Sequence, residues 1–271
     1  MAKFSLAALT ALELAPPELI EVAARCGYDH VGLRLLPATP DGIAYRLMDD
    51  SALMSETIKR LRSTGVTVAD LEVVALRPDT DIAAFTPFFD AGARVGAKHI
   101  LVAGYDPDLD RFSERFMRFC EAASEFGLTS DLEFMPWTSV PDLTTASRIV
   151  ETVGHPGAGV LVDALHFDRS RSRVEDLGSV PLERLHYWQL CDAPAERPTT
   201  TEGLLHTARE ERMFPGEGGI DLVALARAMP AYITVSIEVP TVQLAKTLDA
   251  EGRARRALKA AKAVVEKART R

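Results

Sequence analysis

The chain has 271 residues and a formal net charge of −8, with 39 acidic side chains against 31 basic ones. Hydrophobic residues make up 47% of it, which supplies a large core and excludes a disordered, collagen-like or coiled-coil protein. Nucleic-acid binders gain affinity by neutralising phosphates, so an acidic chain without a basic stretch argues against a nucleic-acid partner.

The cysteines and the N-terminus indicate the compartment. Three scattered cysteines, Cys26, Cys120 and Cys191, form no C-x-x-C pair, which is typical of a reducing environment. The N-terminal residues show no signal-peptide pattern, and no run of 18 apolar residues occurs. We therefore expect a cytoplasmic protein with no membrane association.

Segments with strand character alternate with amphipathic segments of helical period along the whole chain. The predicted strands are Phe4–Ala8, His30–Leu35, Val66–Val74, His99–Ala103, Ser130–Phe134, Gly159–Asp163, Leu185–Cys191 and Ile233–Val239. The predicted helices are Pro17–Cys26, Ser51–Thr64, Phe85–Val95, Leu109–Phe126, Leu143–Val153, a weak one near Val174–Val180, Leu222–Met229 and Leu248–Ala268. Eight such units favour a single (β/α)₈ TIM barrel domain, an α/β fold, over residues 1–271.

One long connection, Asp192–Gly219, interrupts this alternation. It carries His206, Arg209, Arg212 and the glycine-rich turn Pro215–Gly219. Connections longer than about 15 residues inside a compact domain are usually functional or mobile. We therefore expect part of this segment to close over a substrate.

Four predicted strands carry an oxygen-bearing side chain in the inward phase near the carboxyl end. Alternate residues of a barrel strand face the interior, and apolar residues such as Leu132 and Val162 define the outward set. The inward residues are Glu133, Asp163, Gln189 and Glu238. Because active sites of such barrels lie at the carboxyl ends of the strands, we expect these four side chains to meet in one cavity.

Three carboxylates in one cavity repel one another and are costly to desolvate, and a divalent cation would remove that cost. Carboxylate and amide oxygens suit Mg²⁺ or Mn²⁺ best, with Zn²⁺ and Co²⁺ as alternatives. We therefore predict a metal site formed by Glu133, Asp163, Gln189 and Glu238. The competing interpretation is that each carboxylate separately pairs with an arginine or caps a helix.

Further side chains are candidates for substrate binding. His166 lies just after the sixth predicted strand, where an imidazole can orient a substrate or transfer a proton. Arg34 and Glu72 point inward from the second and third strands, and a guanidinium there can hold a carboxylate or phosphate. A structural Arg34–Glu72 pair is an equal alternative. Trp137 is placed to wall the pocket, and Arg209 to reach it from the long connection.

These strand ends resemble the xylose-isomerase-like TIM-barrel superfamily, which comprises sugar phosphate isomerases, epimerases and their relatives. The resemblance covers nearly the whole chain and is carried by Leu132–Phe134, Leu161–His166, Gln189–Asp192, Pro215–Gly218 and Ser236–Val239. It implies that Glu133, Asp163, Gln189 and Glu238 hold a divalent metal. It also implies that Glu133 and Glu238 act as acid and base, and that His166 contacts the substrate.

Gln189 departs from the epimerase pattern, which commonly has histidine at this position, and is similar to the bacterial 3-dehydroshikimate dehydratases. The resemblance implies a metal-dependent isomerase or epimerase of a small sugar-like polyhydroxy carbonyl compound. Such an enzyme removes a proton next to the carbonyl, and the metal stabilises the resulting enolate. A dehydratase with His166 as base is the second expectation, and a non-catalytic metal-binding barrel is the third. The expected partner is a small-molecule substrate, and self-association into a homo-oligomer is compatible with this fold.

Overall fold

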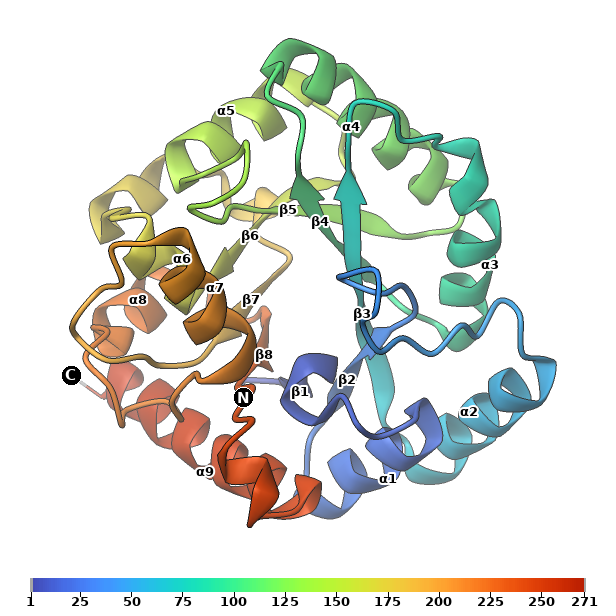
Figure 1. The fold of residues 1–271 in the computed structure, drawn as a ribbon, viewed down its shortest axis with the longest axis vertical. Helices are drawn as coiled ribbons and strands as arrows, with labels where there is room; N and C mark the ends of the chain where they lie inside the picture. The colour runs from blue at the N-terminus through green and yellow to red at the C-terminus, as the bar shows by residue number, and fades with distance from the viewer. Residues whose placement is uncertain (1, 271) are drawn as a thin grey trace.

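The computed structural model describes residues 2–270 and forms a closed barrel of eight parallel strands inside a ring of helices (Figure 1). The strands are β1 (Phe4–Leu6), β2 (His30–Arg34), β3 (Thr67–Leu76), β4 (His99–Gly104), β5 (Thr129–Glu133), β6 (Ala158–Asp163), β7 (Tyr187–Leu190) and β8 (Thr234–Ile237). Each strand pairs with its neighbours in sequence, and β8 closes on β1. The predicted TIM barrel is confirmed.

The helices follow the strands in order. The α-helices are α1 (Pro16–Cys26), α2 (Ser51–Thr64), α3 (Thr86–Val95), α4 (Leu109–Ser124), α5 (Leu143–Val153), α6 (Ala164–Arg169), α7 (Thr201–Glu210), α8 (Leu222–Ala228) and α9 (Ala250–Arg269). The short 3₁₀ helices are η1 (Ala8–Ala11), η2 (Ala83–Phe85), η3 (Val174–Ser179), η4 (Leu182–Arg184) and η5 (Leu244–Lys246). Gly27 and Gly65 end α1 and α2 in the left-handed conformation, as is typical of helix C-caps.

The structure differs from the sequence-based prediction in two connections. The weak helix expected near Val174–Val180 is the 3₁₀ helix η3, preceded by the short helix α6. The connection Asp192–Gly219 was predicted without helices, but it contains α7, whose start is capped by the Thr200 hydroxyl. Figure 1 shows α7 closer to the barrel opening than the outer helix α8.

Two apolar clusters confirm the predicted inward and outward phase of the strands. The larger cluster lies between the barrel and its helices and includes Leu132 and Trp188. The smaller one fills part of the barrel interior and consists of Leu101, Leu161 and Tyr187. Because alternate residues separate these clusters, polar residues in the inward phase are forced into the barrel interior. In the described part of the chain, no helix is long and apolar enough to cross a membrane.

Candidate active site

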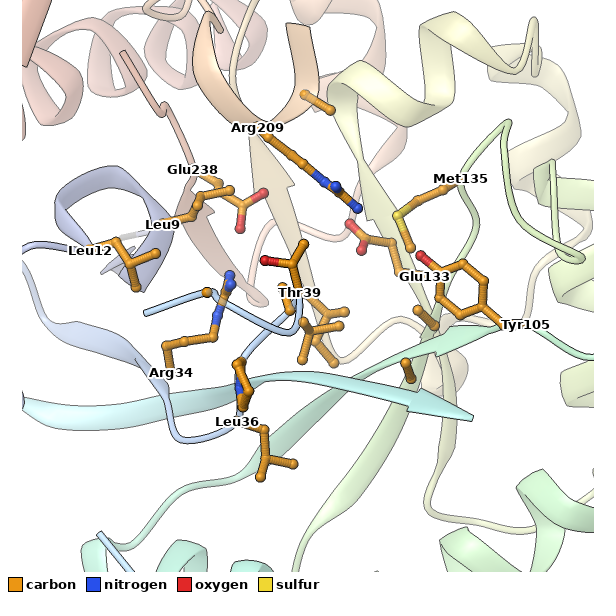
Figure 2. A pocket seen from close by; sticks show the side chains of 18 of the residues that line it. Leu9, Leu12, Arg34, Leu36, Thr39, Tyr105, Glu133, Met135, Arg209 and Glu238 are labelled. Carbon is orange, nitrogen blue, oxygen red and sulfur yellow. The ribbon is translucent and has the colours of Figure 1, made fainter. Parts of the chain in front are cut away.

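A cavity of about 480 Å³ opens at the carboxyl ends of the strands. Glu133 ends β5 and Glu238 follows β8, and Figure 2 shows their carboxylates pointing into the same space. Asp163 ends β6 and Gln189 lies beside it on β7, with both side chains completely buried. The structure therefore brings the four predicted oxygen-bearing side chains to one end of the barrel. Glu133 and Glu238 line the cavity as expected, whereas Asp163 and Gln189 are fully buried and do not line it.

Arg212 lies among these groups and was not predicted to be part of the cluster. Its Nη1 is 2.6 Å from Asp163 Oδ2, and its Nη2 is 2.8 Å from Glu238 Oε2. Nη1 also lies 3.4 Å from the sulfur of the buried Cys191, and Nε donates to the Ala208 carbonyl. The competing interpretation, in which carboxylates pair with arginines, therefore applies to Asp163 and Glu238, and the single guanidinium of Arg212 bridges both.

The remaining site oxygens are less well satisfied. Gln189 Nε2 donates to Glu238 Oε1 at 3.2 Å, which leaves Gln189 Oε1 buried without a hydrogen-bond partner. Glu133 Oε1 is also buried without a hydrogen-bond partner. Buried oxygens without partners cost about 1–3 kcal/mol each, so this arrangement is suited to a further positively charged or donating group.

The carboxylates differ in acidity because their surroundings differ. Burial raises the pKa of Glu133 well above its usual range, and the charges of Asp163 and Glu238 add to the effect. Burial raises the pKa of Glu238 to about 7, although Arg212 opposes it. Burial also disfavours the charged form of Asp163, but Arg212 and His166 together outweigh it and lower the pKa of this carboxyl group. Two carboxyl groups with separated acidities are typical of acid–base chemistry.

His166 and Trp137 form one wall of the cavity. The backbone N–H of His166 donates to Asp163 Oδ1 at 3.0 Å, and its Nε2 is 3.7 Å from Glu133 Oε1. Burial lowers the pKa of the His166 imidazole to about 4, so the ring is neutral at pH 7. The Trp137 ring meets it edge to face, with centroids 5.1 Å apart. Both residues line the cavity, as their predicted role in substrate binding requires.

Arg34 and Glu72 form the structural pair that the sequence allowed. Arg34 Nη2 is 2.8 Å from Glu72 Oε2, and Glu72 Oε1 accepts a hydrogen bond from the Ala8 backbone. Gly32 makes room for this carboxylate, because a Cβ there would lie 2.6 Å from Glu72 Oε1. Arg34 also lines the cavity, whereas Glu72 is fully buried and is not among the lining residues.

Arg209 lies on α7 and lines the cavity. In Figure 2 its guanidinium points toward Glu133 from the side of the long connection. The expectation that this connection contributes to the site agrees with the position of both Arg209 and Arg212. Arg212 was named among the candidates of that connection, but an irregular segment has no periodicity from which its burial could be predicted.

Asp192 holds the connection in place after α7. Its side chain is 1% exposed, and its two oxygens accept hydrogen bonds of 2.8–3.1 Å from backbone N–H groups. The donors are Ala193, Gly216, Gly218 and Ile220. A further pair of backbone hydrogen bonds joins Asp192 to Met213, the residue after Arg212. Asp192 thereby positions the segment that delivers Arg212 to the carboxylates.

The donor types at the carboxyl ends suit a divalent cation. In the described residues, however, Glu133, Asp163 and Glu238 do not bring ligand atoms within 4.8 Å of one another, and Arg212 pairs with two of them. Glu133 and Gln189 each offer a buried oxygen without a partner, and two more carboxylates lie next to them. Oxygen-only ligand sets of this kind suit Mg²⁺ and Mn²⁺, and carboxylates also bind Zn²⁺. Glu133, Asp163, Gln189 and Glu238 are the residues that would hold the ion.

A second group of ligand-type side chains lies at the opposite, amino-terminal end of the barrel. Ligand atoms of His99, Asp131 and His186 lie within 4.8 Å of one another. His186 Nδ1 is 2.7 Å from Asp131 Oδ1, and the charge of Asp131 raises the pKa of His186 against the opposing effect of burial. These two groups already form a hydrogen-bonded pair, whereas the carboxyl-end set retains unpartnered oxygens beside the cavity.

Comparison with known proteins identifies the family and the fold. The family described as xylose isomerase-like TIM barrel matches residues 20–264. An inosose isomerase from Bacillus velezensis is 22% identical over 227 residues, covering 78% of this chain and 77% of the relative. Another inosose isomerase, from Halalkalibacterium halodurans, is 22% identical over 215 residues, covering 75% of this chain and 74% of the relative.

Two solved structures have the same fold. A structure of the IolI protein with a bound zinc atom superposes with a TM-score of 0.81 at 22% identity, covering 99% of this chain and 100% of that one. A D-allulose 3-epimerase from Methylomonas sp., in complex with D-allulose, gives a TM-score of 0.71 at 17% identity, covering 97% and 96%.

Proposed function

Because the chain belongs to the xylose isomerase-like TIM barrel family, we propose that it is a divalent-metal-dependent isomerase or epimerase of a small sugar-like carbonyl compound. One observation carries the proposal: the carboxylates of Glu133, at the end of β5, and Glu238, just after β8, point into the same cavity. The names of the relatives, inosose isomerase and D-allulose 3-epimerase, support this class of reaction. The chain is in this view an enzyme and not a structural barrel.

The chemistry requires a base that removes a proton from the substrate carbon next to the carbonyl, and an acid that returns a proton. Glu238, with its pKa near 7, takes the proton. The electron pair of the broken C–H bond forms the double bond of an enediolate, and the π electrons of the carbonyl move onto its oxygen. Glu133, whose carboxyl group faces the same cavity, is the acid that returns a proton. Return to the opposite face of the same carbon re-forms the carbonyl and gives an epimer. Return to the former carbonyl carbon gives an aldose–ketose isomerisation, in which the neighbouring hydroxyl loses its proton and becomes the new carbonyl, and the former carbonyl oxygen becomes a hydroxyl.

Other residues of the site hold the substrate and control charge. Arg212 keeps Asp163 and Glu238 in position, and Trp137 and the neutral His166 enclose the cavity on one side. A divalent cation held by Glu133, Asp163, Gln189 and Glu238 would polarise the substrate carbonyl as a Lewis acid. The zinc atom of the IolI structure supports a divalent cation in this fold, and Mn²⁺ or Mg²⁺ is our proposal for this chain.

A dehydratase is the second candidate, and Gln189 is the observation that favours it. Its amide oxygen lies buried and unpartnered where epimerases commonly carry histidine. In that reaction the same proton abstraction is followed by loss of a β-hydroxyl group, and His166 is the candidate base. The product would be a conjugated carbonyl compound, which absorbs ultraviolet light and is thereby distinguished from an isomer.

The test combines metal removal with a substrate panel. The protein is treated with a chelator, dialysed, and incubated with ketoses, inososes and 3-dehydroshikimate, with and without Mn²⁺ or Mg²⁺. We expect interconversion of at least one ketose or inosose, lost on chelation and restored by the metal. The Glu238→Gln variant should fold normally and be inactive. Activity that is indifferent to chelation, or an ultraviolet-absorbing product alone, would refute the proposal.

A further inference from the structure

The cavity has two chemically different halves. The charged half is formed at the strand ends by Arg34, Glu133, His166, Arg212 and Glu238. The other half is apolar and reaches outward from it. Its lining includes Leu9, Leu12, Leu36, Ile43, Phe85 and Tyr105. Figure 2 shows Leu9, Leu12 and Leu36 on the side of Arg34 and Glu238, and Tyr105 and Met135 beside Glu133.

The apolar side chains come from segments that surround the cavity mouth. Leu9 belongs to η1, Leu36 follows β2, and Tyr105 follows β4. These three are only partly buried, since they face the cavity. Ile43, in the connection between β2 and α2, is 50% exposed. Of the large apolar side chains that are exposed in the described residues, Ile43 is the one that lines this cavity.

An unsubstituted sugar is a poor match for this half. A polyol carries hydroxyl groups on most of its carbons, and hydroxyls buried against Leu36, Ile43 or Phe85 would lose hydrogen bonds to water that these three side chains cannot replace. A hydrocarbon or aromatic group gains from the same contact, because apolar area is removed from water on both sides. The cavity volume of about 480 Å³ lies within the range of about 300–1,000 Å³ that is typical of pockets for larger organic ligands.

A hydrogen-bond donor in the cavity wall would help to orient such a ligand. Trp137 Nε1 is buried without a hydrogen-bond partner, and Trp137 lines the cavity next to His166. An indole N–H is a donor only, so it calls for an acceptor oxygen on the ligand. At the outer side, the Arg77 guanidinium lies over the Tyr105 ring, 4.7 Å from its centroid, and holds that aromatic wall in place.

We propose that the cavity binds an amphiphilic substrate, in which the hydroxylated carbonyl ring lies at the carboxylates and an aromatic substituent occupies the subsite of Leu12, Leu36, Ile43 and Phe85. The proposal rests on the proposed function, because it takes the charged half as the place of the reaction. It adds the chemical class of the substrate: a sugar or cyclitol derivative that bears an aryl group, rather than a free sugar.

The experiment compares two ligands that differ only in this substituent. Methyl β-D-glucoside and phenyl β-D-glucoside lack a free carbonyl, so binding is measured without turnover. Affinity is measured by calorimetry and by quenching of tryptophan fluorescence. The chain has two tryptophans, of which Trp137 lines the cavity and Trp188 is buried elsewhere. We expect the phenyl glucoside to bind at least about tenfold more tightly than the methyl glucoside.

Variants then locate the subsite. Leu36 and Ile43 are partly exposed, so these positions should tolerate asparagine. Leu36→Asn and Ile43→Asn should each reduce the preference for the phenyl glucoside to about threefold or less. The affinity for the methyl glucoside should not change. The control is Leu182→Asn, an apolar side chain that is 56% exposed and lies outside the cavity, and it should alter neither affinity.

Each outcome decides the question. Equal affinity for the two glucosides, no measurable binding of the phenyl glucoside at millimolar concentration, or an equal loss for both ligands in Leu36→Asn would overturn the proposal. Failure of the proposed function looks different, since it would appear as absent turnover in the chelation and substrate-panel experiment while the binding preference remained.

Discussion

Replacing Asp192 by alanine tests whether this carboxylate positions the segment that carries Arg212. Asp192 is 1% exposed, and its carboxylate accepts hydrogen bonds from four backbone N–H groups. The change to alanine removes this buried acceptor. A hydrogen bond to a charged group contributes about 1.5–3 kcal/mol, but water can reach some of the freed donors and the losses do not add. We therefore expect a loss of about 3–5 kcal/mol in the free energy of unfolding.

Urea unfolding followed by circular dichroism measures this loss, and thermal unfolding should show a Tm lower by roughly 10 °C. Turnover of the substrate found in the panel should fall further than stability alone explains, because Arg212 loses its position. The matched control is Asp221→Ala. This change removes one exposed helix-capping hydrogen bond, which the Asp221 carboxylate accepts from the Ala224 N–H. It should lower the free energy of unfolding by about 1 kcal/mol. If the two variants lost equal stability, or if Asp192→Ala remained fully active, the positioning role would be wrong.

Three further changes test the site and its supports. Gly218→Ala places a Cβ 2.3 Å from the Ala193 carbonyl oxygen and should cost more than about 2 kcal/mol, whereas Gly178→Ala meets no atom within 4 Å and should cost less than about 1 kcal/mol. Arg212→Met leaves two buried carboxylates without their cation and should cost about 3–5 kcal/mol at pH 7. For His99, burial lowers the pKa to about 4, against about 6.5 in the unfolded chain. The unfolded state therefore binds more protons as the pH falls, so His99 should remove about 2 kcal/mol of stability between pH 7 and pH 5.

Each of these has a clear contrary result. Equal melting temperatures for the two glycine variants would show that the tight contact around Gly218 relaxes without cost. Wild-type stability in Arg212→Met would mean that the carboxylates are neutral in the folded protein. For the histidine, the His99→Gln variant should lose about 2 kcal/mol less than the wild type on going from pH 7 to pH 5. An unchanged pH dependence in that variant would assign the effect to other groups.

The order of residues alone predicts the barrel and the side chains at the strand ends of the site. Eight strands with a clear alternation, and helices closed by glycines such as Gly27, leave few arrangements other than a closed parallel barrel. Once the strand phase is known, the period of two places Glu133 and Gln189 inside the barrel. This is a local property, which is why it could be predicted from the order of residues.

The groups that neutralise and enclose these side chains come from long-range contacts that the order of residues does not predict. Arg212 reaches Asp163 and Glu238 across 49 and 26 residues of sequence, from an irregular segment in which no period marks a buried side chain. Its position depends on the hydrogen bonds of Asp192, and the apolar half of the cavity depends on side chains gathered from several separate connections. Such contacts arise from how the chain closes on itself, and a pattern of neighbouring residues carries no record of them.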